Sequence, residues 1–125
     1  MLRACIVVRE TGGLAPEYVM RFDLPTLPRV GTYLSVHRPG APSHQGEDLI
    51  VRQVWWRLKH PDKQAASRSG ADGIGQLDDV IIECAKAIGP YSSEEWRSEL
   101  IEAERQGLDV EAFDVERPAF VLERR

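Results

Sequence analysis

The chain has 125 residues, with 16 lysines and arginines against 20 aspartates and glutamates, and a formal net charge of −4 at pH 7. A chain of this length is expected to form one domain that folds without metals or disulfides. Its 42% hydrophobic and 29% charged residues exclude a fully disordered, collagen-like or disulfide-framework protein. The apolar stretch in residues 1–10 is too short for a signal peptide, so we expect a cytoplasmic protein that does not bind membranes.

Apolar and polar residues alternate in the first part of the chain, which is the pattern of strands with one buried face. We expect strands over residues 2–9 and 17–24, joined as a hairpin by a turn at Thr11-Gly12-Gly13. A third strand is expected over residues 32–38. The inward residues of these three strands are Leu2, Ala4, Ile6 and Val8, then Tyr18, Met20, Phe22 and Leu24, then Leu34 and Val36.

Residues 49–60 form the longest predicted strand, and its apolar residues change parity part-way. The two groups are Leu49 and Val51 before the change, and Val54, Trp56 and Leu58 after it. We expect a β-bulge near Arg52 and Gln53 at the change. Because Trp55 and Trp56 are adjacent in a strand, they must point to opposite faces. Trp56 is expected in the core and Trp55 on the outer face.

Residues 61–77 contain almost no apolar side chain that could anchor them, and we expect a long mobile loop there. Residues 78–87 alternate again and predict a fifth strand, antiparallel to the fourth. Its expected inward residues are Val80, Ile82 and Cys84.

The period then changes to that of a helix. Ser92-Ser93-Glu94-Glu95 is typical of a capping box with Ser92 as the N-cap, and Gly107 closes the helix after about Gln106. An apolar stripe should pack this helix on the sheet; it consists of Trp96, Leu100, Ile101 and Ala103. The tail over residues 108–125 stays open: Asp109 could cap one turn through Phe113, and residues 119–122 could pair as an edge strand or dock.

These elements predict a single α+β domain over residues 1–125, with a β-rich part over 1–90 and an acidic helix and tail over 91–125. We expect a small, bent, antiparallel sheet or open barrel of about five strands, with one C-terminal helix packed on it. The corner Leu27-Pro28-Arg29-Val30-Gly31, followed by a long strand, looks like the small SH3-like or OB-like β-barrels. The similarity concerns architecture alone, because such folds host many unrelated functions.

The charge is unequally divided, with net +4 over residues 1–68 and net −8 over residues 69–125. An outward Trp55 flanked by Arg57 and Lys59 is what a stacking platform for single-stranded nucleic acid requires. The same tryptophan could instead be covered by the predicted helix or by a protein partner, and we rank helix first, protein second and nucleic acid third. The candidate binding residues are Gln53, Trp55, Arg57, Lys59, His60, Lys63 and Arg68.

No pattern indicates catalysis or a metal. The spacing of His37, His44 and His60 matches no metal motif, and Cys5 and Cys84 are interpreted as buried thiols. We therefore expect no enzyme, no metal and no cofactor. The leading interpretation is a non-enzymatic interaction module, a small accessory or adaptor protein that binds another protein or itself; the alternative is a small β-barrel that binds single-stranded nucleic acid around Trp55.

Overall fold

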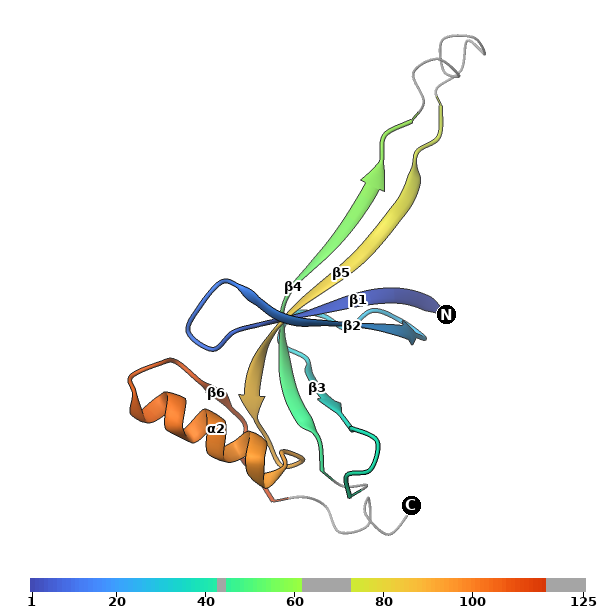
Figure 1. The fold of residues 1–125 in the computed structure, drawn as a ribbon. Helices are drawn as coiled ribbons and strands as arrows, with labels where there is room; N and C mark the ends of the chain where they lie inside the picture. The colour runs from blue at the N-terminus through green and yellow to red at the C-terminus, as the bar shows by residue number, and fades with distance from the viewer. Residues whose placement is uncertain (43–44, 62–72, 117–125) are drawn as a thin grey trace.

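The computed structural model describes residues 1–42, 45–61 and 73–116 (Figure 1). Its strands and single helix are β1 (Leu2–Arg9), β2 (Pro16–Leu24), β3 (Tyr33–Val36), β4 (Glu47–Lys59), β5 (Gln76–Ile88), α2 (Glu94–Arg105) and β6 (Glu111–Ala112). Three features of the sequence analysis lie outside the described residues: His44, residues 119–122, which could pair as an edge strand or dock, and the loop residues 62–72 with Lys63 and Arg68.

The predicted α+β fold is confirmed as a curled half-barrel sheet with one C-terminal helix packed on it. The strand order is β2-β1-β5-β4-β3, and β6 adds a short parallel pairing to β5. One pairing differs from the antiparallel sheet that we expected. Strands β1 and β5 run parallel, from Cys5 beside Ile81 to Arg9 beside Ala85, so the sheet is mixed.

The core lies on the concave face of the half-barrel, and strands β1 to β5 and helix α2 all contribute side chains to it. The predicted inward faces of β1 and β5 are confirmed, and β2 and β3 turn their predicted residues toward the same core. The main buried side chains are Ala4, Ile6, Val8, Leu49, Val51, Val80, Ile82, Cys84, Trp96 and Leu100. One shared core is what a single domain requires.

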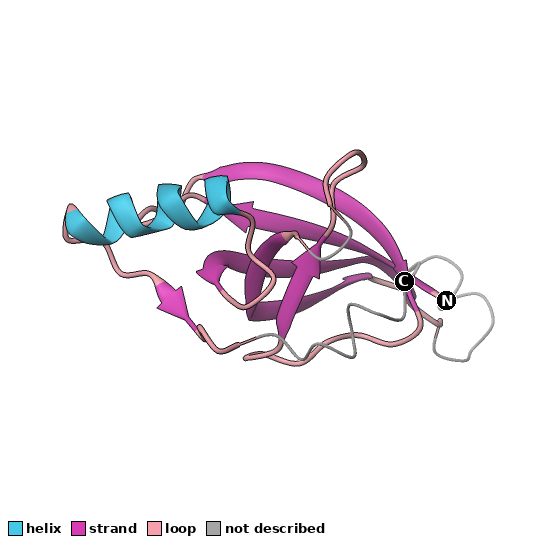
Figure 2. Cartoon of the chain, turned by 90° about the horizontal axis from the view of Figure 1, so that it is seen from below, coloured by secondary structure: helices cyan, strands magenta, loops and turns pink. Residues whose placement is uncertain are grey.

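Helix α2 packs on this core at one end of the curled sheet (Figure 2). The indole of Trp96 is buried, and its Nε1 donates a hydrogen bond to the backbone oxygen of Ala87 at 2.9 Å. The helix begins one residue later than predicted, because the Ser93 side chain, and not that of Ser92, accepts the Trp96 N–H bond at 3.2 Å. At the other end Gly107 has a φ of +91°, which confirms it as the closing residue.

The chain after the helix is extended. The sequence left the conformation of this segment open, and the possible turn from Asp109 to Phe113 is not formed, because Glu111 and Ala112 pair with Ala87 and Ile88 of β5. A backbone bond from the Phe113 N–H to the Ile88 oxygen, 2.8 Å long, continues this pairing.

Strands β4 and β5 extend together beyond the rest of the sheet (Figure 1). We call this two-stranded extension the arm and define it as residues 53–59 of β4 and 76–80 of β5. The predicted bulge is confirmed, since the register shifts between Val51 and Gln53. The predicted loop is shorter than expected at its C-terminal end, because Gln76 and Leu77 already belong to β5.

Candidate functional site

The inner face of the arm carries a row of apolar side chains that starts in the core and continues into solvent. The bulge shifts the parity of β4, so that Trp56 lies opposite Val80 and Leu58 lies opposite Leu77. Val80 is fully buried, whereas Trp56 is 56% exposed and Leu58 71%. We call Trp56, Leu58 and Leu77 the apolar row. A hollow of about 520 Å³ adjoins it at the end of the arm.

The expectation that Trp56 is a core residue is therefore wrong. The alternation places it correctly on the core side, but β1 pairs with β5 only from Ile81 onward, and β3 pairs with β4 only as far as Ile50. The part of the sheet that carries Trp56 thus has two strands, and no described element covers it.

The outer face of the arm holds Gln53, Trp55, Arg57 and Lys59, as predicted. Trp55 is 52% exposed, so the interpretation that the helix covers it is wrong; α2 lies at the opposite end of β5. The Nε1 atom of Trp55 donates a hydrogen bond of 2.6 Å to the Oε2 atom of Glu83. That carboxylate also accepts a bond from Arg9 Nε at 2.9 Å. The indole is therefore held beside an acidic group.

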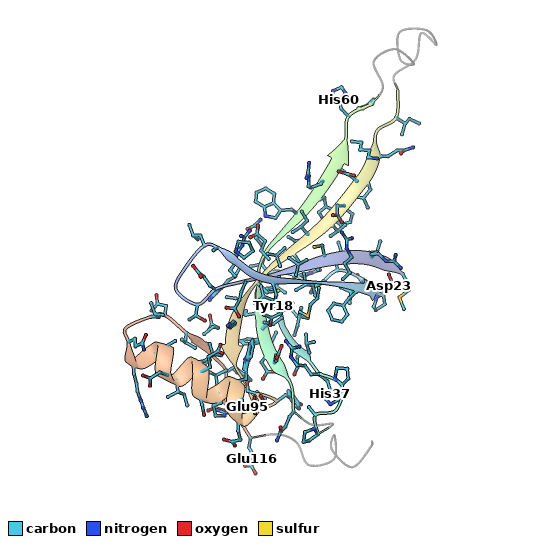
Figure 3. The ribbon with its side chains drawn as sticks, in the orientation of Figure 1. Tyr18, Asp23, His37, His60, Glu95 and Glu116 are labelled. Carbon is cyan, nitrogen blue, oxygen red and sulfur yellow. The ribbon has the colours of Figure 1, made fainter. Side chains whose placement is uncertain are left out.

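The predicted cations of the arm have acidic neighbours on β5. Arg57 lies directly opposite Asp79, and Lys59 Nζ is 4.0 Å from Asp78 Oδ1. His60 is exposed at the far end of the arm, where its ring bonds to the Pro61 oxygen (Figure 3). Among the described arm residues the two cations are thus offset by two carboxylates.

A polar cluster closes the opposite end of the half-barrel. Lys86 is buried and forms ion pairs with Glu17 at 2.7 Å and Glu99 at 2.8 Å. Tyr18 donates a hydrogen bond of 3.3 Å to Glu47, and burial, followed by the charge of Glu47, raises the pKa of this phenol far above its ordinary value. The phenol therefore stays protonated, and these contacts join β2, β4, β5 and α2 as structural links.

Asp48 is a buried polar residue that sequence reasoning did not single out. It is 3% exposed, and its Oδ2 accepts bonds from the Tyr91 N–H at 3.2 Å and from Ser92 Oγ at 3.0 Å. A Cβ atom at Gly89 would lie 2.5 Å from the same oxygen, so a larger residue there would displace the Asp48 carboxylate. Asp48 thus fixes the loop that leads into α2. A polar residue ahead of an apolar run gives no signal of this role.

Two other features of the described residues are a groove that contains arginines and a pair of histidines. On the outer face a groove of about 410 Å³ contains Arg9 and Arg52, but both are paired, with Glu83 at 2.7 Å and Glu111 at 3.3 Å. His37 and His60 lie at opposite ends of the molecule (Figure 3). The described residues contain no cluster of metal-ligating side chains, and no helix among them has the length and apolarity needed to span a membrane.

Comparisons with protein-family models, with curated proteins and with solved structures gave no match.

Proposed function

We propose that this protein is a non-enzymatic interaction module that binds a protein surface through the apolar row of its arm. The observation that carries the proposal is the exposure of Trp56, Leu58 and Leu77 together on one face. Contiguous exposed apolar side chains, outside a core that is otherwise well covered, mark interaction sites. Tryptophan is also a side chain that often dominates binding energy at protein interfaces.

The location of the row supports the same proposal. Because it continues the buried row of Val80 and Ile82, a partner that covers it would extend the core of this domain. The arm also projects from the sheet, so its faces are accessible to a large partner (Figure 1). Its balanced charges suit a partner that is not strongly charged.

Binding of single-stranded nucleic acid is the second candidate, and half-exposed Trp55 is the observation in its favour. The neighbouring carboxylates Glu83, Asp78 and Asp79 weigh against it, because they offset the cations that phosphate contacts would need.

We also propose a cytoplasmic location. Cys5 and Cys84 are both free thiols, as a reducing compartment favours.

The test is site-specific photo-crosslinking in the cells that make the protein. A photoreactive residue at Leu58 should give discrete protein adducts that survive nuclease treatment. The matched control is Val19, which is also apolar and exposed but lies on β2, and it should give none. The Leu58 adducts should vanish when Leu77→Asp is added to the same chain, because a charge in the row opposes its burial.

Three results would contradict the proposal. Adducts that nuclease removes would favour the nucleic-acid candidate, equal adducts at Val19 would show non-specific contact, and an absence of adducts at Leu58 would leave the row without a partner.

A further inference from the structure

We propose that the partner of the arm is a second copy of this chain, joined through antiparallel pairing of the two β4 edges along Gln53–Lys59. This inference rests on the proposed interaction function and names its partner: a second copy that extends the sheet beside β4, so that the two apolar rows join on one face. It follows from an open strand edge and from the sequence along it.

The outer edge of β4 loses its neighbour where the arm begins. Strand β3 pairs with β4 as far as Ile50, and the last backbone bonds on that edge join Val51 to Gly31 at 2.8 Å and to Thr32 at 2.9 Å. Among the described residues none pairs with this edge from Gln53 to Lys59. An unpaired strand edge offers a row of backbone donors and acceptors to another strand.

A second copy can use this edge only in a register that keeps like faces together. In an antiparallel pair, residues directly opposite each other point to the same side of the sheet. The apolar row therefore stays on one face only when a symmetric pair is centred on a residue. The candidate centres are Trp55, Trp56 and Arg57.

Charge and polarity favour the centre at Trp56. A pair centred on Arg57 would set this arginine against Arg57 of the second copy, and like charges directly opposite are destabilising. A pair centred on Trp55 would set Leu58 against Arg52 of the second copy. Centring on Trp56 avoids both conflicts.

The favoured register gives every side chain a suitable neighbour. On the inner face Trp56 meets its own copy, and Val54 meets Leu58 of the second copy. On the outer face Trp55 meets Arg57 of the second copy, which allows a cation–π contact. Gln53 meets Lys59 of the second copy on the same face, and each of the three unlike contacts occurs twice because the dimer is symmetric. The edge of β4 is thus complementary to itself.

The first test is the oligomeric state of the purified chain, measured by sedimentation over roughly two orders of magnitude in concentration. We expect a reversible monomer–dimer equilibrium. Trp56→Lys should shift it to monomer by at least about tenfold in Kd, because it places two cations at the centre of the pair. The control Val19→Lys, on exposed β2, should leave it unchanged. Thermal melts of both variants check that they fold.

The second test fixes the register by disulfide formation in mild oxidant. Trp56→Cys should crosslink two chains rapidly, because directly opposite residues lie within the distance that a disulfide spans. Leu58→Cys should not, since in this register the two copies of residue 58 are four positions out of line, about 14 Å along the strand. Native Cys5 and Cys84 are buried and do not compete.

A chain that remains monomeric throughout overturns the proposal, and so does a dimer in which Leu58→Cys crosslinks as readily as Trp56→Cys. If the chain is monomeric while Leu58 still gives protein adducts in cells, the partner is a different protein and the interaction function stands. If those adducts are absent as well, both proposals fail.

Discussion

Cys84 places an ionisable thiol in the centre of the core. Burial first, and then the charge of neighbouring Glu83, raise the pKa of this thiol from 9.0 to about 12. In the unfolded chain the thiol loses its proton at lower pH than in the folded chain. The stabilising contribution is therefore complete below about pH 9 and is lost as the pH rises toward 12.

The raised pKa of Cys84 predicts that the free energy of unfolding depends on pH in the alkaline range. The free energy of unfolding in urea should fall as the pH rises from about 9 toward 12, and the fall should be smaller in Cys84→Ala, whatever the stability of that variant at neutral pH. Identical slopes in the two proteins would mean that the thiol is not protected from ionisation.

Single residues also mark where sequence reasoning succeeds. Alternation assigns the face of Val8, Ile82 and Trp56 correctly, because it depends only on strand geometry. It fails to predict the exposure of Trp56, because burial depends on which strands lie alongside. The prediction of the helix cap fails for a similar reason: Ser92 and Ser93 are equivalent in the local sequence, but the Ser92 hydroxyl donates to the distant Asp48 and accepts a bond from the Gly89 N–H instead.

Helix α2 is attached mainly through its apolar stripe. Trp96 is buried against the core and bonds to the Ala87 oxygen, so Trp96→Ala should cost about 3–5 kcal/mol in the free energy of unfolding. Trp96→Phe keeps most of the packing and loses the hydrogen bond, and should cost clearly less. Urea titrations of both variants measure this. A Trp96→Ala protein as stable as the wild type would show that the helix is held by its ion pairs instead.

The secondary-structure elements that could be predicted are those that depend only on a short stretch of sequence. The hairpin of β1 and β2, the bulge in β4 and the end of α2 each follow from a short stretch of sequence. The parallel pairing of β1 with β5 does not, because nothing in either strand specifies its neighbour. The segment of β6 was missed because Glu111 and Ala112 have no alternation of their own, and their pairing with β5 defines the strand.

Stability should vary along the whole molecule. In the centre, β5 pairs on both sides, with β1 and β4, whereas in the arm β4 and β5 pair only with each other among the described residues. Two-stranded ribbons are marginally stable by themselves. In dilute solution, amides at Trp56–Lys59 should therefore exchange hydrogen much faster than those at Ile6–Val8. Mass-spectrometric exchange can measure this difference, and equal protection would mean that the arm is covered or intrinsically rigid.

The central position of β5 has a consequence for how the chain acquires its structure. The hairpin of β1 and β2 and the pair of β3 and β4 belong to opposite halves of the sheet, and β5 is the strand that joins them. During synthesis both halves are made before residues 76–88, so they stay unjoined until β5 is available. Until then each half keeps an exposed strand edge. Completing the sheet requires contacts between strands that are far apart in the sequence, such as Cys5 with Ile81. Topologies of this kind fold slowly, so we expect the nascent chain to depend on chaperones until β5 is complete.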